Sequence, residues 1–481
     1  MLGPNDRASS LLLLLMLGQG ALITPTIDGR WLTGGLTEAC RISLFDLIEK
    51  NIMMSGEPIV LHSALLFTVQ AAWSGDKWQM DIAMGQRGMY FSMLRHSGML
   101  EPNPSMNNEM IHQQRSNVDM LWREWTAQEQ RSRLVYSWVM VDQDLSLFHD
   151  QTPMFSVTEF GVPMPDADVL WRAKTAAEWS QVFEQVHEFS GGYSSVGSGA
   201  RPFSLRDLFR LFLDDAIVSQ NVELTPLQLR LLLHPLQSLV CQFRQLLSCF
   251  SDTSGFRMGS KSVNAASTKV RLEEVQAMLQ RWYGLADRYM KAGNLTCPMM
   301  QANLVIFHLV SLNAVTNFQE IERLARRDGV DGSYQEVQWM HKQCITDVEE
   351  AIFHCGQVLR LVRDMPRSVR PPWWSAALYR ASLILWCDSL VQNDAMTPTS
   401  GLFPLSDGTL AVDNLTPDHP LIVRYLTKRE GKPVLTKRDG ASMSIDNPFA
   451  VLFYCVDAIG EGVSTRFTDG LCSKLTRLAK S

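Results

Sequence analysis

The chain has 481 residues, of which 46% are hydrophobic, and its formal net charge is −6 at neutral pH. This length predicts about two to four domains with sizeable cores, and the composition excludes a wholly disordered chain. The acidic balance argues against a chain that grips nucleic acid by itself, because binding to phosphates needs a basic face.

The cysteines and histidines form no metal-binding pattern. A zinc finger needs closely spaced pairs of thiolates or imidazoles, and the sequence contains no C-x2-C, C-x4-C or H-E-x-x-H motif. We therefore expect no cofactor in this chain, with zinc only if a finger module precedes it. We predict free, buried thiols in a reducing compartment for the nine cysteines, Cys40, Cys241, Cys249, Cys297, Cys344, Cys355, Cys387, Cys455 and Cys472.

The amino-terminal part of the chain predicts several helices. The apolar run 11–17 resembles a secretory signal, but it is short and no A-x-A cleavage site follows, so a core helix is the better interpretation. No apolar run reaches the roughly 18 residues that a membrane span needs. The expected elements are helices at 9–22, 36–54, 61–73 and 78–95, a turn at 24–35, and a surface loop at 101–118.

The stretch 122–165 begins as an amphipathic helix. Apolar side chains follow the helical period at positions 134, 138, 141, 145 and 148. Glu129 and Arg133 have the i, i+4 spacing and order that favour an ion pair. The helix should end before Pro153, since a proline disfavours helical geometry in the residue ahead of it. An extended segment over 154–165 should then lie on a helical body.

This stretch resembles the signature of the fungal-specific transcription factor regulatory domain, also called the middle homology region. The resemblance covers about forty residues in order and spacing. Two features depart from the family pattern: Ser132 replaces a middle arginine, and Gln151-Thr152 replaces an Arg-Pro turn. The matching residues are Trp122, Trp125, Glu129, Arg131, Arg133, Leu134, Asp142, Ser146, Val162, Pro163 and Pro165.

The remaining sequence is also helical by pattern. Helices are expected at 170–189, 204–220, 225–250, 268–292, 298–325, 333–363, 372–392, 448–462 and 466–479. The glycine- and serine-rich run 190–201 predicts a linker, and 393–447 is loop-rich with no alternating strand pattern. We therefore divide the chain into a regulatory core at 1–189, the linker at 190–201, and a carboxyl-terminal helical region at 202–481.

An all-α enzyme of the isoprenoid or lipid type is the alternative. Asp214-Asp215 could belong to a magnesium site for a diphosphate, but Val218 stands where a third carboxylate is needed. Asn313 is followed by Asn317 and Ile321, which does not complete a second metal motif. No nucleophile, base and oxyanion donor come together, so we predict no catalytic residues and no enzyme.

The sequence thus predicts an all-α array of packed helices with a loop-rich stretch near the carboxyl terminus. The resemblance implies a nuclear fungal transcription regulator of a metabolic or secondary-metabolite gene set, with no membrane association. It would reach DNA through a module that this chain lacks and would contact other transcription proteins or a DNA-bound partner. A small-molecule effector and a second copy of the chain are further partners that the resemblance leaves open.

Overall fold

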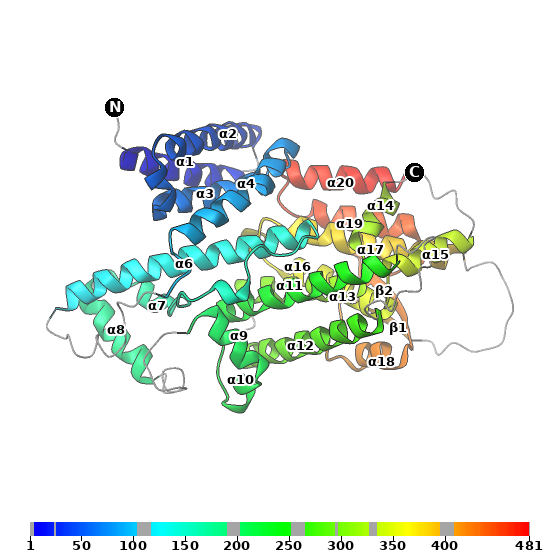
Figure 1. Cartoon of the computed structure of the whole chain (residues 1–481). Coiled ribbons are helices and arrows are strands. Elements are labelled where there is room, and N and C mark those ends of the chain that lie inside the picture. Colours follow the sequence, from blue (N-terminus) through cyan, green and yellow to red (C-terminus); the bar gives the residue numbers. More distant parts are fainter. Residues whose placement is uncertain are drawn as a thin grey trace, which may run out of the picture. The chain divides into compact units, whose positions relative to one another are not determined.

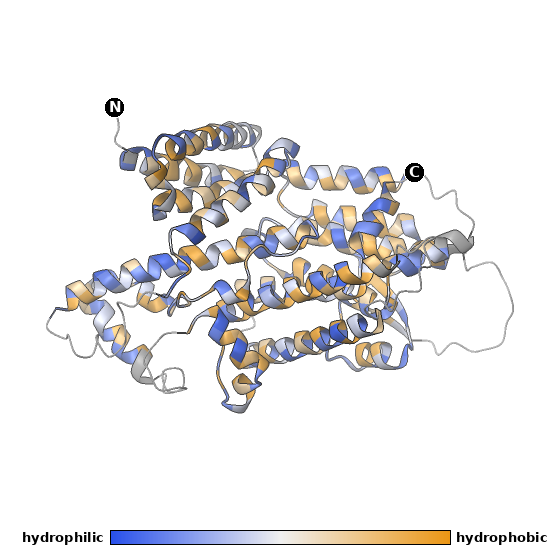
Figure 2. Ribbon diagram, in the orientation of Figure 1, coloured by the Kyte–Doolittle hydropathy of each residue, from blue (hydrophilic) through white to orange (hydrophobic). Residues whose placement is uncertain are grey.

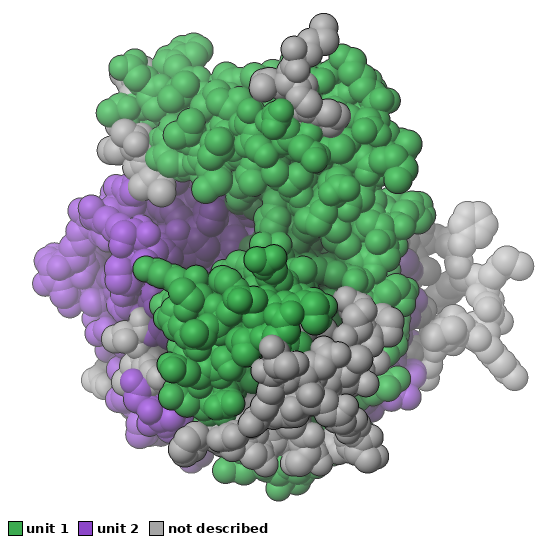
Figure 3. All heavy atoms as spheres, turned by 90° about the vertical axis from the view of Figure 1, so that its left-hand side faces the viewer, with its two compact units in different colours: residues 1–72, 77–145, 153–235 green, residues 73–76, 146–152, 236–481 purple. Residues whose placement is uncertain are grey.

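The computed structural model describes residues 4–23, 26–102, 117–189, 203–251, 265–293, 297–326, 334–394 and 408–480. Of these described residues, 76% are helical and few lie in strands, which confirms the predicted all-α class. The chain forms two compact units, described separately below: unit 1 contains residues 1–72, 77–145 and 153–235, and unit 2 contains residues 73–76, 146–152 and 236–481 (Figure 3).

Unit 1 consists of helices and the segments between them (Figure 1). Its longer helices are α1 (Pro4–Ile23), α2 (Ile27–Lys50), α3 (Pro58–Ala72), α4 (Lys77–His96), most of α6 (Val118–Phe148), α8 (Ala176–Phe189), α9 (Leu205–Leu213) and the first part of α11 (Pro226–Ser251). Its short helical turns are η1 (Ile52–Gly56), η2 (Val157–Glu159), α7 (Asp168–Trp171) and α10 (Ala216–Ser219).

The amino-terminal helices pack on one another, α1 against α2 and α3, and α3 against α4. The apolar run of α1 is a helix of this packed group, with Leu11 and Leu15 buried and Leu13 and Leu17 exposed. The turn predicted at 24–35 is wrong from Ile27 onward, because Thr26 caps a helix there by accepting a hydrogen bond from Gly29 N at 3.1 Å.

The long helix α6 crosses the core of unit 1. Trp138 is fully buried, and its ring lies 5.8 Å from Tyr90 and 5.5 Å from Phe91 of α4, between ring centroids. Leu134 and Leu145 are buried as the helical period predicts, and the helix ends at Phe148, before Pro153. The division into units falls inside α6 and α11, whereas the predicted linker 190–201 lies outside the described residues.

Unit 2 is a helical array with a small sheet. Its helices are the last part of α11, α12 (Ala265–Lys291), α13 (Pro298–Val315), α14 (Phe318–Ala325), α15 (Tyr334–Cys344), α16 (Val348–Asp364), η3 (Arg367–Val369), α17 (Trp374–Asp394), α18 (Pro420–Lys428), α19 (Pro448–Gly460) and α20 (Arg466–Leu478). Outer helices such as α12 and α20 carry separate hydrophobic and hydrophilic stripes (Figure 2).

Three helices form the centre of unit 2. Helix α16 packs against both α13 and α17, and most of the residues of α13 are buried. By length and composition α13 could cross a membrane, contrary to the prediction that no run is long enough, but 72% of it is buried within the structure, as in the core helix of a globular protein.

Several predicted helices are each two helices in the structure. The region 298–325 breaks between α13 and α14, and 333–363 breaks between α15 and α16. These two breaks are bonded to each other: Asn317 N donates to Cys344 O at 2.7 Å, and Thr346 N donates to Val315 O at 2.8 Å. Likewise 170–189 is divided into α7 and α8, and 204–220 into α9 and α10.

The stretch 393–447, predicted to lack strands, contains a three-stranded sheet in its described part. Strand β2 (Lys432–Thr436) lies between β1 (Thr409–Ala411), which is parallel to it, and β3 (Ser442–Ser444), which is antiparallel. The strands are only three to five residues long, too short for an alternating pattern to stand out.

The core of unit 2 contains a histidine pair. His308 of α13 and His354 of α16 are buried, with their Nδ1 atoms 2.8 Å apart. One imidazole donates and the other accepts, and burial disfavours a charge on either ring, so the pair is neutral near pH 7. Burial lowers the pKa of His308 well below its usual value and lowers that of His354 to about 3.

We expect Trp138→Ala to reduce the free energy of unfolding by about 3–5 kcal/mol, because a large buried ring would leave a cavity. Urea unfolding followed by fluorescence measures this loss. The control is Trp31→Ala, since Trp31 is 77% exposed and its loss should change stability by about 0.5 kcal/mol or less. A Trp138 effect below about 1 kcal/mol would contradict a core role.

We expect acid to destabilise unit 2 through the histidine pair. Below pH 6.5 an unfolded imidazole binds a proton that the buried ones exclude, so stability falls as the pH falls, by about 1.4 kcal/mol per pH unit for each histidine. The double variant His308→Asn/His354→Gln should flatten the dependence of urea stability between pH 7.5 and pH 5. An unchanged slope would show that the pair does not titrate on unfolding.

Candidate functional site

Asp142 of α6 anchors the extended segment that follows the helix. Its carboxylate is fully buried and accepts hydrogen bonds from Met154 N at 2.8 Å and Phe155 N at 3.1 Å. The side chains of Arg87 and His234 approach it at 3.6 and 3.4 Å. A buried charge costs several kcal/mol unless it is paired and hydrogen-bonded, so this set of donors explains why an aspartate can occupy the core.

Two further side chains of α6 hold the same segment. The Tyr136 hydroxyl donates to Val162 O at 2.9 Å and accepts from Leu205 N at 3.0 Å. The Glu129 carboxylate accepts from Asp166 N at 3.1 Å, and burial raises its pKa. Positions 142, 136 and 129 follow one another at intervals of nearly two turns back along the helix, while their partners at 154–155, 162 and 166 follow in chain order, so the segment 154–166 runs antiparallel to α6.

The signature arginines bind neighbouring parts of unit 1. Arg131 donates to the carbonyl oxygens of Met99 at 3.1 Å and Glu101 at 2.9 Å, and also to that of Gly98, so it holds the turn that follows α4. Arg133 forms the predicted ion pair with Glu129 at 2.7 Å. It also pairs with Asp168 at 2.9 Å.

The remaining signature residues are structural as well. Trp125 belongs to a buried cluster of Leu121, Leu170, Trp179 and Phe183, against which Trp122 packs. Leu134 and Val162 are fully buried, Pro163 pairs with Ser204 in an isolated β-bridge, and Pro165 is half-buried. Ser146 is also fully buried, but it lies in unit 2, whereas the other signature residues lie in unit 1.

The described residues contain no group of three or more histidine, cysteine or acidic side chains that could hold a metal. Asp214 and Asp215 are exposed, at the end of α9 and just before α10. All nine cysteines are free, five of them buried, three half-buried, and Cys249 exposed. The prediction of buried thiols is therefore correct for five.

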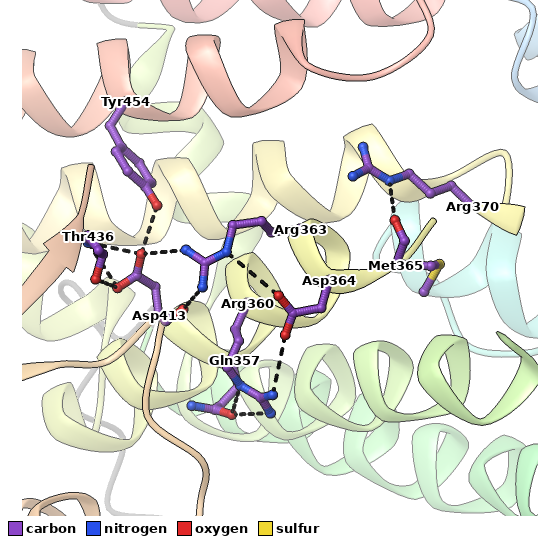
Figure 4. A network of polar contacts seen from close by, with 9 residues as sticks. All are labelled: Gln357, Arg360, Arg363, Asp364, Met365, Arg370, Asp413, Thr436 and Tyr454. Atoms are coloured by element: carbon purple, nitrogen blue, oxygen red, sulfur yellow. Dashed lines mark hydrogen bonds and ion pairs between the residues drawn. The ribbon is translucent and has the colours of Figure 1, made fainter. Parts of the chain in front are cut away.

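A pocket of about 850 Å³ lies in unit 2 among α16, α17, α19 and the β2–β3 turn, and we call it the Asp413 pocket. Figure 4 shows the polar network beside it. Asp413, fully buried, accepts from Thr436 N at 3.0 Å, from the Tyr454 hydroxyl at 2.8 Å, and from Arg363 at 3.3 Å. Burial and Asp413 raise the pKa of Tyr454, which keeps the phenol protonated as a donor.

Close backbone packing shapes this network. A Cβ at position 356 would lie 2.4 Å from Val412 O, so only a glycine lets α16 approach the chain beside β1. Gln357, one residue later, donates to Val412 O at 3.1 Å and Leu415 O at 2.8 Å. These contacts fix the residues around Asp413 against α16.

The charges that line the Asp413 pocket balance. Arg370 donates to Met365 O at 3.1 Å and lies over the Trp374 ring, and burial lowers its pKa. The four cationic residues of the lining are Arg363, Arg370, Lys437 and Arg438, and the four acidic ones are Asp364, Asp439, Asp457 and Glu461. The lining has no histidine, cysteine or serine.

No local sequence pattern predicts this pocket. Asp413 is a single aspartate in the stretch predicted as loop, and its partners Arg363, Thr436 and Tyr454 come from distant positions. No spacing rule relates them. Only the folding of 408–447 onto α16 and α19 brings them together.

The comparison with protein families identifies the class of protein. Residues 2–282 match the fungal specific transcription factor domain. The chain therefore belongs to this family, which confirms the resemblance and supports a transcription regulator rather than an enzyme.

Similar proteins carry transcription factor names. The chain is 63% identical to Transcription factor MYCGRDRAFT_87993 of Zymoseptoria tritici, 55% identical to Transcription factor 1 of Elsinoe fawcettii and 42% identical to Transcription factor PfmaH of Pestalotiopsis fici. In each case 99% of the chain is covered, with 50%, 49% and 48% of the relative, so the chain spans about half the length of these proteins. No solved structure matches the chain significantly.

We expect Asp142→Asn to cost about 3–5 kcal/mol of unfolding free energy, because it removes the carboxylate that faces a buried arginine. Urea unfolding measures the loss. The control is Asp168→Asn, whose side chain is 69% exposed, and whose ion pair should contribute less than about 1 kcal/mol. Equal effects of the two substitutions would contradict the anchoring role of Asp142.

Proposed function

We propose that this chain is the regulatory body of a nuclear fungal transcription regulator whose DNA contact is made by a module outside these 481 residues. The observation that carries the proposal is the family match over residues 2–282. The named transcription factors that the chain resembles are about twice as long as the part it covers, which leaves room for such a module in the whole protein.

Two features of the chain support a DNA-binding module outside these 481 residues. Its net charge of −6 disfavours unaided binding to a polyanion. Its cysteines lack the paired spacing that a zinc finger or zinc cluster uses to close a tetrahedron. The DNA contact would come from the same polypeptide or from a DNA-bound partner protein.

The target genes are proposed at the level of class alone. Regulators of metabolic genes need an input that reports on metabolism, and a helical body with pockets can supply one if a ligand favours one packing over another. We propose that the regulator controls a metabolic or secondary-metabolite gene set and that a small molecule is its effector. We also propose that it contacts other transcription proteins and that two copies of the chain pair with each other. The pockets of unit 2 are the structural feature that supports the effector.

A fusion of residues 1–481 to an unrelated DNA-binding domain tests the regulatory role. We expect the fusion to change the output of a reporter with the matching binding site in a fungal nucleus, relative to the DNA-binding domain alone. Reporter transcript and nuclear fusion protein are measured together. The variant Asp214→Asn/Asp215→Asn should behave as the unmodified fusion, because these exposed carboxylates belong to the enzyme alternative.

A fusion that accumulates in the nucleus and leaves the reporter unchanged would contradict the proposal. Loss of reporter response in the aspartate variant, with unchanged protein level, would instead favour chemistry at that pair. The two outcomes are distinguishable because the first needs no variant at all.

A further inference from the structure

A second pocket of unit 2, with a volume of about 510 Å³, has a different charge pattern. We call it the Arg244 pocket. It lies among the end of α6, the loop at 150–151, the last part of α11, and helices α14 and α15, and all of its lining residues belong to unit 2. Its volume falls within the range of about 300–1,000 Å³ that is typical of small-molecule sites.

The negative charge of Asp150, one of the two acidic residues of this pocket, is balanced by a buried arginine. Asp150 accepts from Arg380 Nη1 at 2.8 Å, and Arg380 is only 1% exposed. The same guanidinium donates to Asn313 Oδ1 at 2.7 Å and to Leu147 O at 3.0 Å, and it lies 4.1 Å from the centroid of the Phe318 ring. Arg380 is therefore committed to fixing the pocket wall and to balancing Asp150.

The second acidic residue is also paired. Glu320 and Arg323, three residues apart on α14, form an ion pair at 2.9 Å. Both line the pocket. Their charges cancel, so together they give the pocket no preference for a cationic or an anionic ligand.

Arg244 of α11 is the charge that remains. It is half-buried and lines the pocket, and within the described part of the chain it has no ion pair or hydrogen bond to a carboxylate. Burial lowers its pKa, and no acidic neighbour opposes that effect. A half-buried guanidinium without a counter-charge is costly, and an anion that enters the pocket would remove this cost.

The rest of the lining suits an organic molecule. Gln245, Gln343 and Asn313 supply amide groups, while Met340 and Trp339 supply apolar surface, and the Trp339 side chain is 63% exposed. A ligand with one charged end and a flat apolar body would use both kinds of surface. A carboxylate matches the guanidinium best, because the two planar groups form paired hydrogen bonds.

We propose that the Arg244 pocket binds a small organic carboxylate of single negative charge, with Arg244 as its anchor. The site would be the effector site of the regulator proposed above, and it rests on that function only for its biological role. A single charge follows from a single unbalanced cation, whereas a phosphate group with two charges would face only one. The Asp413 pocket, with four cationic and four acidic residues in its lining, has no such preference.

Direct binding to the purified chain tests the proposal. The probes are benzoate and 2-naphthoate, each compared with its neutral primary amide, by isothermal titration calorimetry and thermal melting. We expect the carboxylates to bind and to raise the melting temperature by about 2 °C at ten times Kd. The amides should bind at least about ten-fold more weakly, because a charged hydrogen-bonded pair is lost.

Three variants locate the binding. Arg244→Gln should weaken carboxylate binding by about 10- to 100-fold and bring it level with amide binding. Arg244→Lys should recover part of the affinity, since it restores the charge but not the paired geometry. The matched control is Arg326→Gln, because Arg326 is an exposed arginine paired with Glu322 and does not line the pocket.

The outcomes separate this proposal from the regulatory function. Equal binding of carboxylates and amides, no binding of either carboxylate, or full binding by Arg244→Gln would each overturn the pocket assignment. Because no reporter is involved, such a result leaves the fusion experiment to decide the regulatory role. Conversely, if the chain binds carboxylates through Arg244 but its fusion leaves the reporter unchanged, the carboxylate site is supported and the regulatory function is contradicted. Melting of Arg244→Gln without ligand shows whether the variant is folded.

Discussion

The buried carboxylate of Asp142 is the interaction on which the architecture of unit 1 depends. It ties the backbone of Met154 and Phe155 to the middle of α6, and the chain then runs back along the helix past Tyr136 to Glu129. An extended segment cannot satisfy its own backbone groups, so a helix that supplies side-chain partners along its length solves this problem. The signature stretch thus forms one structural unit, in which an extended segment covers the helix that precedes it. Asp142, Tyr136 and Glu129 of that helix hold the segment in place.

Local features could be predicted from the sequence, and contacts between distant segments could not. Helices α11, α12, α19 and α20 lie within a few residues of their predicted bounds. An apolar stripe marks each of them locally, and α11, α19 and α20 also have a proline or a capping residue at the start. The breaks at Thr316 and Ile345 were missed because each is stabilised by the other across about thirty residues. The same reason applies to β1–β3, which pair within a stretch that has no local strand signal.

The candidate sites follow the same rule. The Glu129–Arg133 pair follows from helical spacing, and the structure contains it. The Arg244 pocket gathers residues from five helices, and the Asp413 pocket from three helices and the β2–β3 hairpin, so no window of sequence holds more than a fragment of either. Of the eleven signature residues, only Ser146 lines either pocket, and it belongs to the lining of the Arg244 pocket. The residues by which the signature is recognised therefore say little about the chemistry of a ligand, which depends on the lining of the pockets in unit 2.

The two departures from the family pattern have different structural meanings. Ser132 lies on a buried side of α6, only 1% exposed, where the Gln128 amide approaches its hydroxyl at 3.4 Å. A long arginine would have to leave that position or displace its neighbours, so serine suits the close packing there. The second departure lies at a pocket, because Gln151, which stands where the pattern has arginine, lines the Arg244 pocket. An arginine at 151 would add a second cation to this pocket and would favour a ligand of two negative charges. With glutamine there, the net charge of the pocket depends on Arg244 alone, so the proposed binding of a monoanion rests on a residue in which this chain differs from the family pattern.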